Sequence, residues 1–87
     1  MLNIMATRLM RCEFSVSAMD DGIDPDNVRA ALREFRDIGI LPEVGDGLPI
    51  QFVNRETNLI SYAYLHVVDM VPNPFTETVD YVVGYRK

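Results

Sequence analysis

Residues 59–68 read Leu-Ile-Ser-Tyr-Ala-Tyr-Leu-His-Val-Val, and no other stretch of the chain says more about its fold. We predict a strand over about 59–70, because side chains of a strand point alternately to the two faces of a sheet and this stretch alternates with that period. Both faces are largely apolar: one carries Leu59, Ser61, Ala63, Leu65 and Val67, and the other carries Ile60, Tyr62, Tyr64, His66 and Val68. Such a strand needs cover on both faces.

One helix is predicted to supply part of that cover, over residues 25–38. Asp24 can cap its first turn, and Pro25 fits the first helical position, where its missing N–H costs nothing. Gly39 is a natural stop. The apolar stripe consists of Val28, Ala31, Leu32, Phe35 and Ile38. One helix covers one face, and the face of Leu59, Ala63, Leu65 and Val67 matches its apolar stripe and is the expected core. We therefore expect the Tyr62 and Tyr64 face to meet a partner, such as a second copy of the chain.

Three more strands are expected, over about 8–18, 49–53 and 76–85. Residues 54–58 have the composition of a hairpin turn, and Pro72-Asn73-Pro74 is expected to form a loop that cannot continue a ladder. The sequence therefore predicts a single two-layer α+β domain over residues 1–87. One helix would pack on a four-stranded, mainly antiparallel sheet in the order β-α-β-β-β, and short connections make the last three strands an antiparallel meander.

The composition restricts the class of protein. The 87 residues carry a net charge of −5, which disfavours direct nucleic-acid binding, since that binding depends on Lys and Arg. The acidity fits solubility, a basic partner or mimicry of nucleic acid. Cys12 is the single cysteine, so no intrachain disulfide forms. No apolar run has the length of a membrane span and no signal peptide is recognisable, so we expect a cytoplasmic protein that binds no membrane.

We find no pattern typical of catalysis, metal binding or a cofactor. His66 is the only histidine, and Cys12, in an alternating strand pattern, is expected to be a buried structural thiol. The acidic run from Asp20 to Asp26 fails the EF-hand pattern, because Pro25 and Ala31 stand where that pattern needs Gly and Glu. The prediction is a protein that is not an enzyme and holds no cofactor.

Arg29, Arg33 and Arg36 form a ridge along the predicted helix, away from its apolar stripe. A solvated helix face explains this ridge. It also offers a grip for an acidic partner or a phosphate, because guanidinium groups match carboxylates and phosphates.

The tyrosines form the second candidate set. Tyr62 and Tyr64 share one face of a strand with His66, and Tyr81 and Tyr85 share one phase of its expected neighbour. These side chains either border the core, form a protein interface or stack on RNA bases, although the RNA-recognition motif and a basic surface are missing. Our candidate partner-binding residues are therefore Tyr62, Tyr64, His66, Tyr81, Tyr85, Arg29, Arg33 and Arg36.

The function that follows is a non-catalytic protein-binding module, homodimeric through its sheet face. Such a module would act as a small adaptor, or as an inhibitor that occludes a larger protein complex, as compact phage-encoded or mobile-element proteins do. The alternative is a domain that binds a small ligand or nucleotide between sheet and helix or between two protomers. An acidic mimic of nucleic acid ranks third, because the carboxylates outside residues 20–26 are scattered.

Overall fold

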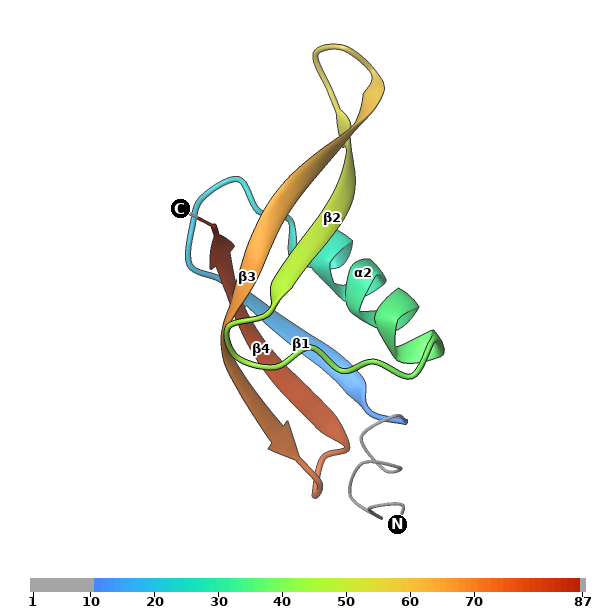
Figure 1. Cartoon of the computed structure of the whole chain (residues 1–87), viewed down its shortest axis with the longest axis vertical. Coiled ribbons are helices and arrows are strands. Elements are labelled where there is room, and N and C mark those ends of the chain that lie inside the picture. The colour runs from blue at the N-terminus through green and yellow to red at the C-terminus, as the bar shows by residue number, and fades with distance from the viewer. Residues whose placement is uncertain (1–10, 87) are drawn as a thin grey trace.

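The computed structural model describes residues 11–86 and contains one helix and four strands (Figure 1). These elements are β1 (Glu13–Ala18), α2 (Pro25–Asp37), β2 (Gly47–Asn54), β3 (Leu59–Asn73) and β4 (Thr78–Tyr85). The predicted α+β class and the sequential order β-α-β-β-β are confirmed. Of the strand predicted over 8–18, residues 8–10 lie outside the described residues, and β1 begins at Glu13.

The sheet is mixed, which corrects the prediction of a mainly antiparallel one. Its strands lie in the order β1-β4-β3-β2, so their order in space differs from their order along the chain. The β2-β3 and β3-β4 pairs are antiparallel, as predicted for the last three strands, but β1 pairs with β4 in parallel. The reason is that α2 carries the chain from one edge of the sheet to the other. β4 then returns between β1 and β3, in the direction of β1.

Local sequence explains the helix. The Oδ1 atom of Asp24 accepts a hydrogen bond from the backbone N–H of Asp26 at 2.9 Å, and Pro25 begins the first turn. The helix ends at Asp37, and Ile38 caps it instead of lying inside it as predicted. Ile38 is exposed, so the buried part of the apolar stripe is Val28, Ala31 and Leu32.

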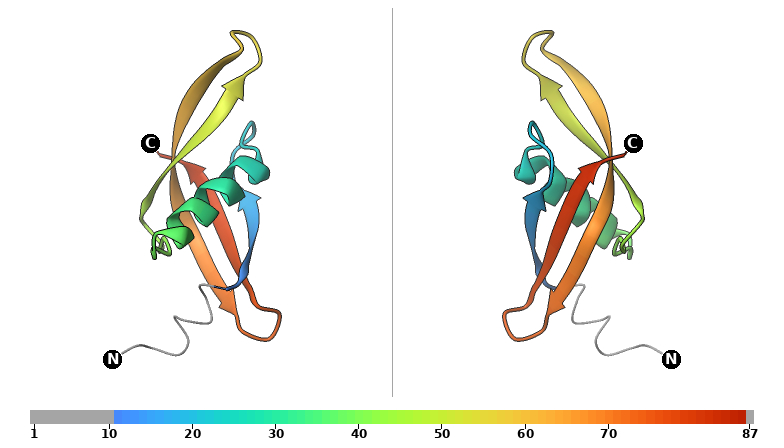
Figure 2. Two further views of the ribbon diagram at one scale, coloured as in Figure 1. Left: turned by 90° about the vertical axis from the view of Figure 1, so that its right-hand side faces the viewer. Right: turned by 90° about the vertical axis from the view of Figure 1, so that its left-hand side faces the viewer.

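The core lies between α2 and the part of the sheet that α2 covers (Figure 2). We call α2 and this part of the sheet, which excludes residues 51–62, the body. Its largest fully buried side chains come from α2, β2, β3 and β4: Val28, Leu32, Leu48, Leu65, Val67, Val79, Tyr81 and Val83. Cys12 is buried beside them, as predicted for a structural thiol, and burial raises the pKa of its thiol, with Glu77 adding to this rise and Arg36 opposing it.

The β2-β3 hairpin projects beyond the body and lengthens the molecule to 47 × 22 × 21 Å (Figure 1). We call residues 51–62, the part of this hairpin beyond the Ile50 and Ala63 pair, the arm. At its tip, Asn54 Oδ1 accepts a hydrogen bond from the N–H of Glu56 at 2.9 Å, and Asn58 adopts a φ of 56°. These contacts close the hairpin predicted over 54–58.

The predicted loop at Pro72-Asn73-Pro74 is wrong in part, because β3 continues through Pro72 to Asn73 and pairs there with β4. Beyond His66, β3 has no β2 partner, and such an open edge tolerates a proline. A bulge between Val67 and Asp69 shifts the phase of this segment, so that Met70 packs against the core. No helix within residues 11–86 is long and apolar enough to cross a membrane.

Candidate functional site

The outer surface of the β2-β3 hairpin, facing away from α2, is a row of exposed apolar side chains. Cross-strand pairs set this row: Val53 lies opposite Ile60, and Pro49 lies opposite Tyr64, with Tyr62 between them. Val53, Ile60, Tyr62 and Tyr64 are 59%, 65%, 69% and 54% exposed. We call these four residues and Pro49 the outer arm face. As the pattern predicts, α2 leaves this face uncovered.

Tyr64 is the most constrained member of the outer arm face. Its ring lies over Gly47, where an added Cβ would stand 2.9 Å from the phenolic oxygen. The guanidinium of Arg86 lies 5.4 Å from the ring centroid, and the backbone N–H of Arg86 donates to the carbonyl of Tyr64 at 3.2 Å. Tyr64 is therefore an anchored aromatic surface, which costs little side-chain entropy when it binds a partner.

The inner side of the arm is also uncovered, and this corrects the prediction that Leu59 belongs to the core. Leu65 and Val67 of the same face are buried, but Leu59 is 66% exposed. The reason is length: α2 has 13 residues and spans about 20 Å, whereas β3 has 15 and spans roughly 50 Å. That comparison of lengths is a signal in the sequence that reveals the arm.

The four tyrosines do not form one surface. Tyr81 is 1% exposed, and its hydroxyl donates to the carbonyl of Pro42 at 2.8 Å, so it is a core residue that no partner of the folded chain can reach. Burial, with Asp46 and Glu43 nearby, raises the pKa of Tyr81 to about 12. Tyr85 is partly exposed and lies against the loop before α2, where its N–H donates to Asp20 Oδ2 at 2.8 Å.

His66 is half-buried on the same side of the sheet as Tyr64. Its Nδ1 atom is buried and has no hydrogen-bond partner among the described residues. The side chain borders a hollow of about 540 Å³ with Asp20, Gly84 and Arg86. No group of three or more His, Cys, Asp or Glu side chains within residues 11–86 is placed to hold a metal ion.

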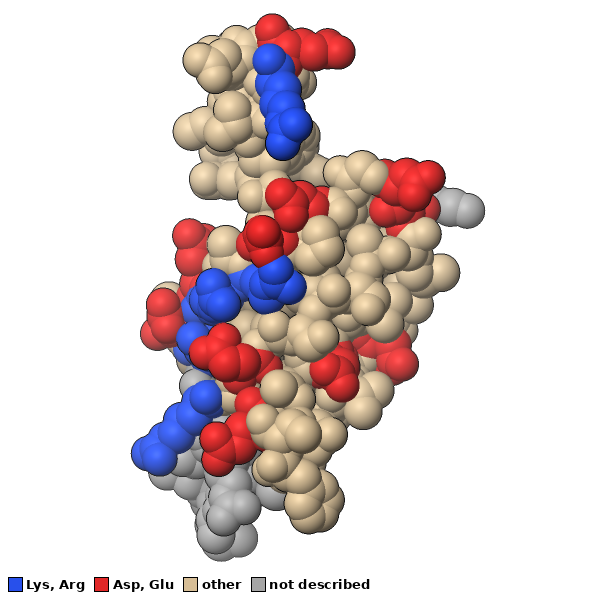
Figure 3. All heavy atoms as spheres, turned by 180° about the vertical axis from the view of Figure 1, so that it is seen from behind, with Lys and Arg blue, Asp and Glu red and all other residues tan. Residues whose placement is uncertain are grey.

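The arginine ridge is engaged inside the chain. Arg29 forms an ion pair with Asp26, and Arg33 lies 3.5 Å from Glu13 of β1. Arg36 donates to the carbonyl of Cys12 at 2.6 Å, and its guanidinium lies 5.1 Å from the ring centroid of Phe14. Arg33 and Arg36 therefore tie α2 to β1, whereas Arg29 pairs within α2. On the face drawn in Figure 3, basic and acidic side chains are interspersed, so the surface there has no single sign of charge.

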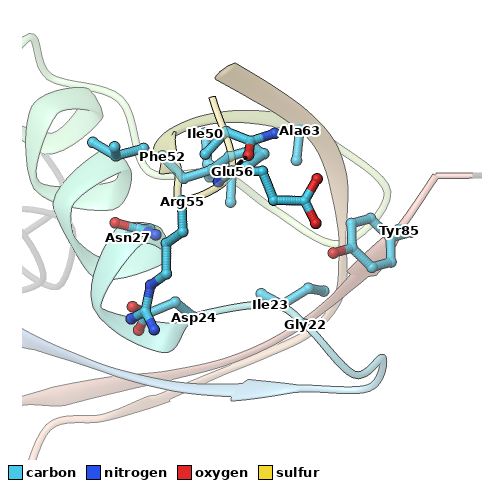
Figure 4. A pocket seen from close by; sticks show the side chains of 12 residues that line it. Gly22, Ile23, Asp24, Asn27, Ile50, Phe52, Arg55, Glu56, Ala63 and Tyr85 are labelled. Atoms are coloured by element: carbon cyan, nitrogen blue, oxygen red, sulfur yellow. Dashed lines mark hydrogen bonds between the residues drawn. The ribbon is translucent and has the colours of Figure 1, made fainter. Parts of the chain in front are cut away.

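Sequence reasoning raised a ligand pocket between sheet and helix without locating it, and the structure has two hollows between α2 and the free side of β2. One, of about 790 Å³, is bordered by the arm, the start of α2 and Tyr85 (Figure 4). The other, of about 570 Å³, lies further along α2 and reaches Ile38 and Tyr62. Their position depends on which strand takes the edge of the sheet, a non-local property without a local signal in the sequence.

The chain matches no protein-family model, no curated protein and no solved structure. The candidate site therefore stands on its geometry.

Proposed function

We propose that this chain is a non-catalytic protein-binding module that acts through the outer arm face and, in its simplest form, pairs there with a second copy of itself. The observation that carries this proposal is the row of four large apolar side chains, each more than half exposed, on one hairpin. Contiguous exposed apolar surface marks interaction sites, and tyrosine is enriched in them.

Charge supports a second copy as the occupant. The hairpin from Gly47 to Tyr64 contains one arginine and one glutamate and is neutral, although the whole chain carries −5. Two copies that meet through their arms bring neutral surfaces together and keep the acidic bodies apart. A symmetric pair is also the common way to cover a self-complementary apolar patch.

A module of this kind works as a small cytoplasmic adaptor, or as an inhibitor that occludes part of a larger complex. Its energy of association would be concentrated in a few anchors, of which Tyr62 and Tyr64 are the largest. We no longer include Arg29, Arg33 and Arg36 among the partner-binding residues, because their guanidinium groups contact groups of the same chain.

Sedimentation equilibrium over a range of concentrations tests the proposal. We expect a monomer–dimer equilibrium that Tyr62→Ala and Val53→Ser each shift toward monomer by about tenfold or more. Val44→Ser is the matched control, because Val44 is also 59% exposed but lies in the loop before β2. A strict monomer at the highest concentration measured, or equal effects of the two Val→Ser changes, would overturn self-association through the outer arm face.

A small-ligand site is the second candidate, because the two hollows beside α2 have volumes of about 790 and 570 Å³, within the range of roughly 300–1,000 Å³ typical of ligand pockets. A thermal-shift screen with nucleotides and metabolites tests it. Stabilisation that increases with ligand concentration supports this second candidate, and no stabilisation across the screen argues against it.

A further inference from the structure

The free edge of β2 carries backbone groups that point away from the sheet. β2 is an edge strand, and Asp46 just before it accepts a hydrogen bond from the N–H of Val67 at 3.0 Å. Bonded and non-bonded positions alternate in an antiparallel pair, so the even-numbered residues of β2 bond to β3. The N–H groups of Gln51 and Val53 and the carbonyl of Pro49 therefore face outward. No backbone hydrogen bond joins them to another described residue.

A groove runs beside this edge. The two hollows next to α2 share Asn27 and Ile50, and together they are bordered by every residue from 49 to 55. These residues project from both faces of β2, so the groove lies along the edge itself. Its opposite wall is α2, where Ala30, Phe35 and Ile38 present an apolar surface. An extended chain that enters this groove meets main-chain donors and acceptors on one side and an apolar helix face on the other.

The charges around the groove indicate which chain fits it. Asp24, Glu34 and Glu56 border it, against the single guanidinium of Arg55. Figure 4 shows Asp24 and Glu56 on opposite sides of the larger hollow, one from the start of α2 and one from the hairpin. This excess of carboxylates favours Lys or Arg side chains and disfavours an acidic segment.

We propose that the edge of β2 binds an extended basic and apolar segment of a partner protein as a fifth strand, seated against α2. Backbone bonds to Gln51 and Val53 supply register, and the apolar wall and the carboxylates select the side chains. A second copy of the chain fits less well for two reasons. It would bring the Glu34 carboxylate of one copy toward the same acidic groove of the other, and Pro49 has no backbone N–H to donate in edge-to-edge pairing. This surface shares Pro49, Val53 and Tyr62 with the outer arm face, but it binds through the free backbone edge of β2 and the wall of α2, so the inference goes beyond the proposed function.

The experiment follows backbone amides by NMR while an acetylated peptide amide, Val-Lys-Val-Lys-Val-Lys, is added to the full chain. We expect hydrogen exchange at Gln51 and Val53 to slow by about tenfold or more, with little change at Phe52, whose N–H is already bonded to β3. Two N-methylated isomers, modified at the three Val or at the three Lys residues, block opposite edges of the peptide. One isomer should lose at least about tenfold in affinity, while the other binds like the parent.

Charge is tested with a matched pair of variants. Glu34→Gln should weaken binding of the Lys peptide by roughly two- to fivefold, a typical effect for an exposed ion pair. Glu43→Gln changes the net charge equally, but Glu43 does not border the groove, so it should have no effect. A Val-Glu peptide of the same length should bind more weakly than the Lys peptide.

Three results would overturn the inference. The first is binding of the Lys peptide that leaves exchange at Gln51 and Val53 unchanged, and the second is no binding at all. The third is slowing of exchange at these two amides with protein concentration alone, which would identify a second copy as the occupant of the edge. The edge of β2 is tested by amide exchange and peptide binding, whereas the proposed function is tested by sedimentation of Tyr62→Ala and Val53→Ser. Failure of one proposal can therefore be told apart from failure of the other.

Discussion

The beginning and the middle of β3 have similar sequences but different surroundings. Leu65 and Val67 are sealed between α2 and the sheet, whereas Leu59 and Ile60, in the same strand, are about two-thirds exposed. Apolar residues in the body stabilise the folded chain, because burial removes their surface from water. The same residues in the arm contribute little to folding and retain their surface for association. The reach of α2, more than residue type, therefore divides β3 into a core segment and a binding segment.

The largest expected contrast uses two leucines on the same face of β3. Leu65→Ala should lower the free energy of unfolding by about 2–5 kcal/mol, because it leaves a cavity beside α2. Leu59→Ala should change it by less than about 0.5 kcal/mol. Urea unfolding in dilute solution measures both. If Leu59→Ala lowered the free energy of unfolding nearly as much as Leu65→Ala, Leu59 would be buried in the folded chain, which would contradict an exposed arm.

Alkaline unfolding tests the body through Tyr81. Its pKa in the folded chain, about 12, exceeds the ordinary value of 10, so stability is intact below pH 10 and falls as the pH rises toward 12. The expected loss is about 2–3 kcal/mol. Tyr81→Phe should remove this loss, at a cost of about 1–2 kcal/mol at neutral pH, because the carbonyl of Pro42 loses its partner.

The matched change in the arm is Tyr62→Phe, which removes a hydroxyl that is already in water. The Tyr62→Phe variant should lose as much folding stability at high pH as the unmodified chain does. Guanidinium unfolding at several pH values between about 8 and about 11.5 compares the unmodified chain, Tyr81→Phe and Tyr62→Phe. An unchanged alkaline loss in Tyr81→Phe would contradict the assignment to Tyr81.

Hydrogen exchange compares the two ends of one ladder. The N–H groups of Ser61 and Leu65 both bond to β2, one in the arm and one in the body. We expect Ser61 to exchange at least about tenfold faster after correction for intrinsic rates, because few buried contacts hold the arm closed. Equal protection would show that the arm and the body open as one unit.

The smallest expected effect concerns Gly47, at the base of the hairpin. Gly47→Ala should move the ring of Tyr64 and cost less than about 1 kcal/mol, because the clash is with the outer end of a ring that is 54% exposed and can shift toward solvent. The ring shifts of Tyr64 and the Arg86 side chain report this movement by NMR. Gly39→Ala is the control, since it has open space but a φ of +86° and should leave both signals in place. Unmoved Tyr64 signals in Gly47→Ala would refute the contact.

Local chemistry explains what the sequence could predict. Asp24 and Pro25 fix the start of α2, and period-two patterns locate β2, β3 and β4. The same patterns identify Tyr62 and Tyr64 as a face that the helix does not cover. These features depend on residues close together in the chain.

Non-local pairing explains what the sequence could not predict. Nothing near β1 indicates that it joins β4 in parallel, and so nothing indicated that β2 takes the edge and opens the groove. Tyr81 and Tyr85 share a phase with each other, but only the pairing of β3 with β4 shows that this phase faces the core side. The arginine ridge was placed correctly on α2, while its partners Glu13 and Cys12 lie in and beside β1.

Beyond the Ile50 and Ala63 pair, β2 and β3 pair only with each other. The length of the hairpin can therefore change without changing the pairing of the rest of the sheet. Adding or removing two cross-strand pairs would lengthen or shorten the arm by about 7 Å and keep every side chain on its present face. Adding or removing a single cross-strand pair would instead turn every side chain beyond the point of change to the opposite face of the hairpin. The chain is thus a natural scaffold for grafting, in which the hairpin can be extended in two-pair steps while the register beneath α2 stays the same.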